Sequence, residues 1–283
     1  MPLNQTCPTA EETRDAKTAE AFSDSWDNCF SASPYTLAQV REWFAPLEME
    51  ALAGREVCEL GCGNGGLLQY AARFSRTVTG VELGRCVNVA RGNFRRLGLD
   101  HVAFAQEDIL SFAETHRGQY DFVYCIGVLH HMQDPRKGFE AVVRATRPGG
   151  RFHCWVYGYE GNFLIRSGVE PLRRIASRLP WRLNKYGLAL PLAIPFYLAS
   201  QAVKRLPRTP FARLVPLYGY LCWIADYRFA FHHHVAFDQL VSPQTTYLRR
   251  ETIAAWLAKS GLQETYLLPR NGNSWTFGGV KKP

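Results

Sequence analysis

Strand-like and helix-like segments alternate between residues 56 and 157, and this alternation limits the chain to a small group of folds. Short apolar segments with strand character occupy 56–60, 77–82, 102–106, 121–126 and 151–157. Helical spacing is clearest between them at 67–74, 86–97 and 135–145. Strands that alternate with helices form right-handed βαβ units, which build a mostly parallel sheet covered by helices on both faces.

The alternation stops after residue 160 and resumes near the C-terminus. Residues 251–259 predict a helix that Gly261 ends, and 262–268 and 274–280 predict two strands joined by a turn. We therefore expect an α/β fold with a seven-stranded sheet and a mainly helical insert after the fifth strand. The expected parts are a leader and helical lid (1–54, loose and polar to about residue 20), a core (55–160), the insert (161–245) and a C-terminal completion of the core (246–283).

Positive charge is concentrated in the expected insert. The chain carries 33 Lys and Arg against 25 Asp and Glu, a net charge of +8. Residues 161–250 hold 13 basic and 3 acidic residues, or +10, which leaves −2 for the rest of the chain. A basic segment can face nucleic acid, anionic lipid or an acidic substrate, and it can equally be a solvated surface.

The cysteines and the N-terminus predict a cytoplasmic location. The eight cysteines form no Cys-x-x-Cys pair, and several lie inside apolar strand-like segments, so we expect reduced core residues. Residues 1–17 are polar and mixed in charge, without the basic-then-apolar pattern of a signal peptide.

A glycine-rich turn follows the first expected strand. Gly61, Gly63 and Gly66 have the spacing of a nucleotide-binding turn, in which glycine lets a ligand approach the backbone. Glu82 ends the second strand about 20 residues further on, where an acid holds ribose hydroxyls. Glu59 precedes the glycines, where it could hold a positively charged amino group but would repel a pyrophosphate. Asp108 ends the third strand, where it could accept a hydrogen bond from an adenine amino group, cap a helix, or do both.

The ordered set of motifs resembles the class I S-adenosylmethionine-dependent methyltransferases that act on small molecules. The set is completed by Val128-Leu129-His130-His131 after the fourth strand and by Arg147-Pro148-Gly149-Gly150 before the fifth. The resemblance implies a Rossmann-like sheet, S-adenosylmethionine as cofactor and S-adenosylhomocysteine as product.

The resemblance also implies roles for individual residues. Gly61, Cys62 and Gly63 would contact the methionine portion, and Glu59 its amino group. Glu82 would bind the ribose hydroxyls, with Leu83 against the adenine. The remaining expected cofactor contacts are Asp108 and Ile109 at the adenine edge, Ile126 at the sulfonium end, Asn64 in the glycine turn and Trp26 in the lid.

Catalysis of methyl transfer requires few side chains, because the sulfonium already activates the methyl group and alignment in a dry site provides most of the rate. A base is needed only where the acceptor must lose a proton. His130 and His131 are our candidates, with a structural role as the alternative. Residues His153, Tyr157, Tyr159 and 232–234 are weaker candidates. We expect no metal site, because the adjacent histidines at 232–234 cannot all face one ion.

Two segments have two interpretations each. Residues 22–26 resemble the aromatic lid of related enzymes, or they pack against the sheet. Residues 186–203 contain no charge and are flanked by Arg182, Lys185, Lys204 and Arg205. They form a cap over an apolar pocket or lie in a membrane interface, in contact with anionic headgroups. Both interpretations of this segment indicate a small or lipid-like acceptor with an apolar body.

The basic insert leaves methylation of RNA or another nucleic acid as the alternative function. Against it, the fourth strand lacks the Asn/Asp-Pro-Pro-aromatic motif and the Pro-Cys nucleophile of base methylation, and no known RNA-binding module is present. A domain that binds the cofactor without catalysis is a further alternative. The sequence leaves open the atom that receives the methyl group and the oligomeric state.

Overall fold

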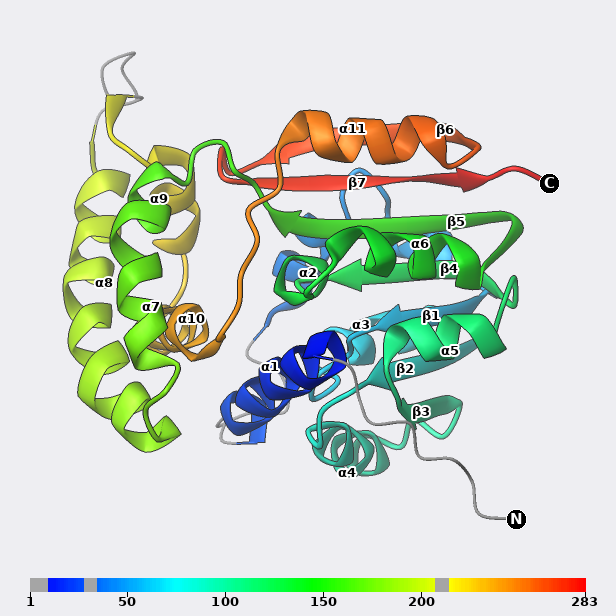
Figure 1. Ribbon diagram of the computed structural model, residues 1–283, viewed down its shortest axis with the longest axis horizontal. Helices are drawn as coiled ribbons and strands as arrows, with labels where there is room; N and C mark the ends of the chain where they lie inside the picture. The colour runs from blue at the N-terminus through cyan, green and yellow to red at the C-terminus, as the bar shows by residue number, and fades with distance from the viewer. Residues whose placement is uncertain (1–9, 28–34, 207–213) are drawn as a thin grey trace.

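The computed structural model describes residues 10–27, 35–206 and 214–283. Its centre is a seven-stranded sheet in the order β3-β2-β1-β4-β5-β7-β6 (Figure 1). β7 is antiparallel to both of its neighbours, and the other pairs are parallel. The strands are β1 (Glu56–Leu60), β2 (Thr77–Glu82), β3 (Val102–Gln106), β4 (Tyr120–Ile126), β5 (Thr146–Tyr157), β6 (Leu262–Arg270) and β7 (Ser274–Lys281).

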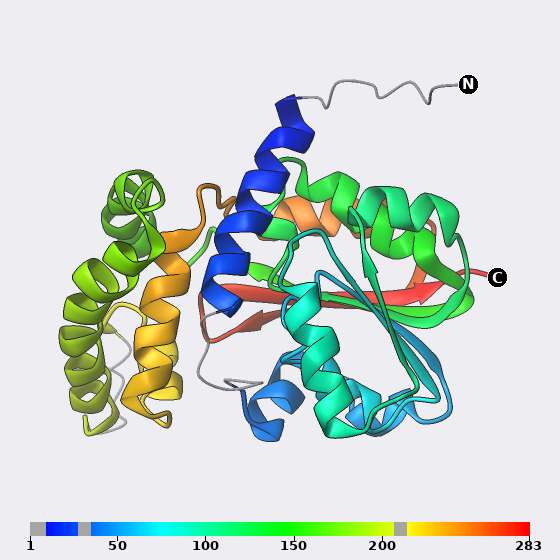
Figure 2. The ribbon, with the colours of Figure 1, turned by 90° about the horizontal axis from the view of Figure 1, so that it is seen from below.

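The central strands are buried on both faces. In β4, Phe122 and Tyr124 pack into one apolar cluster, whereas Val123 and Cys125 pack into the other, because successive side chains point to opposite faces of a strand. The first cluster includes helices α2 (Leu37–Phe44), α3 (Leu68–Ala72) and α4 (Val87–Leu97) and the 3₁₀ turn η1 (Met49–Leu52). The second includes α5 (Ile109–Thr115), α6 (Pro135–Ala145) and α11 (Arg250–Lys259). Figure 2 shows helices on both sides of the sheet.

The insert forms a separate helical layer beside the carboxyl ends of the parallel strands (Figure 1). Ala176, Ala189, Phe237, Leu240 and Val241 form its own buried cluster. α8 packs on α9 and α10 and is farther from the sheet than α10 in both views. The elements of the insert are η3 (Ile165–Val169), α7 (Glu170–Ala176), η4 (Leu183–Ala189), α8 (Leu190–Lys204), α9 (Tyr218–Ile224) and α10 (Phe229–Val241).

The predicted sheet and helical insert are confirmed, with three differences. Residues 10–20 are not a loose leader, because they belong to helix α1 (Ala10–Asp27). This polar helix is held by tertiary contacts. Arg85 pairs with Glu20 and Asp24, and the backbone amide of Gln133 donates to Asp15 Oδ1 at 2.8 Å. α5 was not predicted, and β5 begins at Thr146, with a register irregularity across the expected 148–150 turn.

Candidate functional site

A cavity of about 650 Å³ lies at the carboxyl ends of the parallel strands, between the core, α1 and the insert. This edge of an open α/β sheet is where such folds bind ligands. All of the expected cofactor-binding residues with described side chains line it: Glu59, Gly61, Cys62, Gly63, Asn64, Glu82, Leu83, Asp108, Ile109 and Ile126. Trp26 is in the last turn of α1, but its side chain lies outside the described residues.

The glycine turn packs closely against β2 and against the loop that follows β4. Gly61 has φ +83°, and a Cβ there would lie 2.9 Å from Val128 Cγ1 and closer to Cγ2. The amides of Gly61 and Cys62 both donate to the Val81 carbonyl, at 2.8 and 2.9 Å. Glycine at 61 is therefore required twice, by the backbone angle and by the lack of space.

Glu82 connects the glycine turn to the end of β2. Its Oε2 accepts the Gly63 amide at 2.9 Å, and its Oε1 accepts the Gly84 amide at 2.8 Å. Both glycines thus hold the carboxylate in place at the cavity wall. Burial raises the pKa of Glu82, and the backbone amides oppose that shift.

Asp108 is the N-cap of α5, as one of the two interpretations predicted. Its Oδ1 accepts the amides of Leu110 at 2.7 Å and Ser111 at 3.4 Å. The same residue lines the cavity, so capping does not prevent contact with a ligand.

The cavity is acidic, and it has no basic lining among the described residues. Carboxylates of Asp15, Glu59, Glu82, Asp108 and Asp238 line it, and no described lysine or arginine does. A ligand with phosphate groups would therefore find no lysine or arginine among the described lining residues, whereas a cationic ligand would be attracted to the carboxylates that are ionised.

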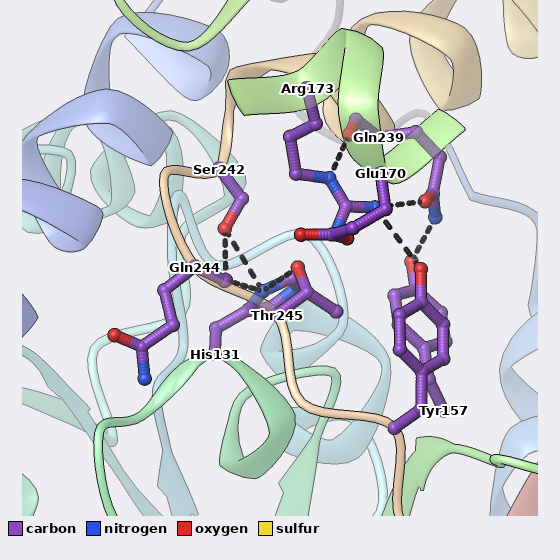
Figure 3. A network of polar contacts seen from close by, with 9 residues as sticks. His131, Tyr157, Glu170, Arg173, Gln239, Ser242, Gln244 and Thr245 are labelled. Atoms are coloured by element: carbon purple, nitrogen blue, oxygen red, sulfur yellow. Dashed lines mark hydrogen bonds and ion pairs between the residues drawn. The ribbon is translucent and has the colours of Figure 1, made fainter. Parts of the chain in front are cut away.

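His130 and His131 have different positions. His131 lines the cavity, whereas His130 does not. His131 Nδ1 lies 3.0 Å from the Gln244 carbonyl, 3.1 Å from Ser242 Oγ and 3.2 Å from Thr245 Oγ1 (Figure 3). Burial lowers the pKa of His131 to about 3. His131 is thus a neutral ring that ties the fourth-strand loop to the segment after α10.

His130 is fully buried, with its ring 4.0 Å from that of Tyr157. Neither of its nitrogens has a hydrogen-bond partner within the described parts of the chain. Burial lowers its pKa well below the usual value. This position favours the structural interpretation of His130 over the catalytic one.

α1 forms part of the cavity wall. Asp15, Thr18, Ala19 and Phe22 line the cavity, and the Phe22 ring lies 4.8 Å from the ring of His131. α1 also contacts α10 of the insert. α1 therefore lies where a lid would have to lie, and its closure over a cofactor stays a prediction.

The three consecutive histidines of α10 diverge, as adjacent helical residues must. His232 lies 3.0 Å from Ser200 Oγ, His233 lies 2.9 Å from the Lys185 carbonyl, and His234 lines the cavity. The three side chains therefore lie in three different environments.

Sequence reasoning missed two carboxylates in this site, Asp15 of α1 and Asp238 of α10. Asp238 is the one that a sequence pattern marks. It is the only acid between Asp226 and Glu251 and lies in a largely aromatic and aliphatic helix, which is a pattern that could have identified it.

The methyltransferase-domain family matches residues 58–154. The ubiquinone biosynthesis O-methyltransferase of Pectobacterium atrosepticum is 32% identical over 149 residues, which cover 52% of this chain and 61% of that protein. A Synechococcus protein of uncharacterized function is 27% identical over 210 residues, or 73% of this chain and 46% of its own length. The chain thus spans less than two thirds of these curated relatives.

Solved structures share the fold at low identity. Magnesium protoporphyrin IX methyltransferase from Synechocystis PCC 6803, with bound SAH, has a TM-score of 0.55 and 15% identity. That alignment covers 95% of this chain and 98% of the other. An O-methyltransferase family protein from Burkholderia thailandensis has a TM-score of 0.52 and 14% identity, with coverage of 87% and 56%.

Proposed function

The chain belongs to the class I S-adenosylmethionine-dependent methyltransferases, and from this premise we propose that it transfers a methyl group from S-adenosylmethionine to a small or lipid-like acceptor with an apolar body. One observation carries the proposal. Glu59, Glu82 and Asp108 converge with the glycine turn on a single cavity that no described lysine or arginine lines. The cofactor is a cationic nucleoside without phosphate, so it fits this set of acids.

In this assignment each side chain holds one part of the cofactor. Glu59 binds the amino group, the 61–63 backbone contacts the methionine portion, and Glu82 accepts the ribose hydroxyls. Asp108 accepts the adenine amino group beside Ile109, and Ile126 lies at the sulfonium end. When bound, the cofactor supplies an activated methyl group. The protein's part is to align the acceptor and to exclude water with α1 and the insert.

The insert supports an acceptor with an apolar body. Leu172, Leu192, Phe196, Leu221 and Phe231 of the insert line the cavity. These side chains come from α7, α8, α9 and α10, so four helices contribute an apolar wall. Burial of an apolar acceptor against such a wall would stabilise the complex by roughly 25 cal/mol per Å² of apolar surface.

We also propose that the outer face of the insert rests on an anionic membrane surface. Ten of the 13 exposed large apolar side chains among the described residues lie between Phe163 and Leu214, including Ile194 at 51% and Leu198 at 61% exposure. Exposed Arg174, Arg178 and Arg182 accompany them. Isolated exposed apolar residues are ordinary, but a concentration beside cations favours a membrane interface.

The stretch Leu183–Lys204 has 22 residues and is long and apolar enough, by length and composition alone, to cross a membrane. Leu192 and Phe196 of this stretch line the cavity, and α8 packs on α9 and α10. A helix that also covers the cavity is better placed along the surface than across the bilayer. With the cytoplasmic location expected from the cysteines, the protein would be peripheral to the cytoplasmic leaflet.

Incubation with radiolabelled S-adenosylmethionine and cell extract tests the function. We expect label in the organic-soluble fraction, and calorimetric binding of S-adenosylhomocysteine. E82Q should lose both, whereas E251Q, which changes an exposed acid of α11, should keep both. Label in RNA would favour the nucleic-acid alternative, and absence of any binding to S-adenosylhomocysteine would refute the proposal.

A further inference from the structure

A carboxylate of the insert, Asp238, faces the cavity with one oxygen unpaired. It lies in α10 beside Phe237, which is buried in the insert's own apolar cluster. Its side chain lines the cavity, and its Oδ1 is buried without a hydrogen-bond partner in the described parts of the chain. An unsatisfied buried acceptor costs about 1–3 kcal/mol, and more when it is charged, so its presence requires an explanation.

The buried cation whose charge acts on Asp238 does not pair with it. Arg173 is 1% exposed, and its Nη1 donates to Glu170 Oε2 at 2.6 Å (Figure 3). Its Nε and Nη2 donate to the carbonyl and Oε1 of Gln239, at 2.6 and 2.8 Å. Glu170 therefore neutralises Arg173, and the guanidinium orients Gln239 instead of pairing with Asp238.

Two tyrosines surround the same corner of the cavity. Gln239 Nε2 donates to the Tyr157 hydroxyl at 2.6 Å, so the Arg173 network also holds Tyr157. Tyr157 and Tyr220 both line the cavity. Burial, and then the nearby charge of Asp238, raise the pKa of both hydroxyls, which therefore stay protonated.

This corner lies near the end of the cavity where the methyl group is expected. Ile126, assigned to the sulfonium end, pairs with Trp155 across β4 and β5. Tyr157 is two residues beyond Trp155, so both side chains lie on one face of β5, and both line the cavity. Asp238 is therefore at the acceptor side of the transfer site.

The surroundings suit Asp238 for accepting a proton near neutral pH. Burial raises its pKa to about 7, and the charge of Arg173 opposes the shift. The groups that face it are Arg173 from α7, Tyr157 from β5 and Tyr220 from α9. A base is most effective when its pKa is near the working pH.

We propose that Asp238 accepts the proton of a hydroxyl group on the methyl acceptor, and that the acceptor is an apolar phenol or enol. The inference rests on the proposed methyl transfer. The hydroxyl oxygen forms a bond to the methyl carbon while the carbon–sulfur bond breaks and its electron pair goes to sulfur. The hydroxyl proton passes to Asp238, so a cation, a carboxylate and a hydroxyl yield a thioether, a carboxylic acid and a methyl ether.

The chemistry distinguishes this acceptor from others. A phenol has a pKa of about 10, so it is protonated at neutral pH and gains from a base placed beside it. A neutral amine attacks with a free electron pair and loses its proton afterwards. Asp238 returns its proton to water after the product leaves.

The test compares wild type, D238N, D238E and the control D226N with two probes, 4-octylcatechol and 4-octylaniline. Asp226 is an exposed acid of the same insert, paired with Lys204. We expect wild type and D226N to methylate the catechol and D238N to lose about 10²–10⁴ in kcat, the usual contribution of a general base. The acid limb of the kcat profile should vanish in D238N and persist in D238E.

Measurements of S-adenosylhomocysteine binding and of thermal unfolding show whether D238N is folded and still binds the cofactor product. D238N should bind S-adenosylhomocysteine as wild type does, and it should unfold at the same or a higher temperature because an unpaired buried charge is removed. Unchanged kcat in D238N, methylation of the aniline but not the catechol, or a catechol that neither binds nor reacts would each overturn the inference. Failure of wild type to bind S-adenosylhomocysteine would instead overturn the proposed function.

Discussion

The hydroxyl of Tyr124 donates a hydrogen bond of 2.9 Å to Oε2 of Glu59, and both side chains are almost completely buried. Burial raises the pKa of Glu59 to about 8; the Tyr124 hydrogen bond opposes this shift, and the charge of Glu82 adds to it. The acid assigned to the cofactor's amino group is therefore costly to ionise in the free protein. A cation bound beside it would provide the missing stabilisation.

Affinity for S-adenosylhomocysteine should accordingly depend on pH. Glu59 must lose its proton to hold an ammonium group, so Kd should fall by up to about tenfold per pH unit as the pH rises toward the pKa of Glu59. Y124F should weaken binding by roughly tenfold at neutral pH, because a hydrogen bond to a charged group is lost. Calorimetry over a pH series measures both effects.

E59Q serves as the control for this prediction. A carboxyl with a raised pKa in the folded state destabilises that state increasingly as the pH rises from the unfolded pKa toward the folded one. E59Q should therefore bind poorly at every pH and yet unfold at a higher temperature than the ligand-free wild type near neutral pH. A pH-independent Kd in wild type would contradict the assignment of Glu59.

G61A should be destabilising and should abolish cofactor binding. The alanine would have a positive φ and a Cβ in contact with Val128. G54A is a matched control, because Gly54 has φ +69° and no atom within 4 Å of the added Cβ. We expect about 1 kcal/mol of destabilisation for G54A and about 2–4 kcal/mol for G61A, measured by urea unfolding. Equal losses would show that the close approach to Val128 is unimportant.

Variants of Asp108 should separate capping from binding. D108N keeps an N-cap and should have near-wild-type stability, whereas D108A should lose about 1 kcal/mol. Both should weaken binding of S-adenosylhomocysteine, since neither keeps the carboxylate. Asp134 caps α6 outside the cavity, so D134A should lose similar stability with no change in Kd. Unchanged affinity in D108N would assign Asp108 a capping role alone.

Arg173 should be the most sensitive arginine of the insert. R173M leaves Glu170 without its cation and removes the donors to Gln239, so we expect about 3–5 kcal/mol of destabilisation. R174M on the same helix replaces an exposed side chain and should change stability by less than about 0.5 kcal/mol. Thermal unfolding of both variants measures this difference. Equal losses of stability in R173M and R174M would contradict the prediction.

The outer face of the insert should bind anionic vesicles. Flotation should recover the protein with phosphatidylcholine vesicles that contain phosphatidylglycerol, and less of it without the anionic lipid or at high salt. The double variant I194D/L198D should stay in solution. L97D changes an exposed leucine of α4, outside the insert, and this variant should float with the vesicles as wild type does. Flotation of the double variant would contradict this surface assignment.

Most of the core was predictable from local sequence. Val123 and Cys125 occupy one face of β4 while Phe122 and Tyr124 occupy the other, and a strand buried on both faces is apolar throughout. Asp108 illustrates a two-sided prediction: its capping role is confirmed, and its adenine contact stays a prediction.

α1 and the insert were less predictable because long-range contacts specify them. Residues 10–20 have too few apolar positions to indicate a buried helix, and Arg85 and Gln133 hold α1 from distant parts of the chain. Similarly, nothing local separates His130 from His131, although only His131 lines the cavity.

The sequence by itself determined the order of strands and helices, the glycine turn at residues 61–63 and the acids that end the first three strands, because periodicity and turn chemistry are local properties. Only the tertiary structure decided that Asp238 of α10 and Tyr157 of β5 meet in one cavity, 81 positions apart in the chain. That meeting depends on how the insert folds back over the sheet through the Arg173 network, and burial there, rather than residue type, sets the pKa of Asp238.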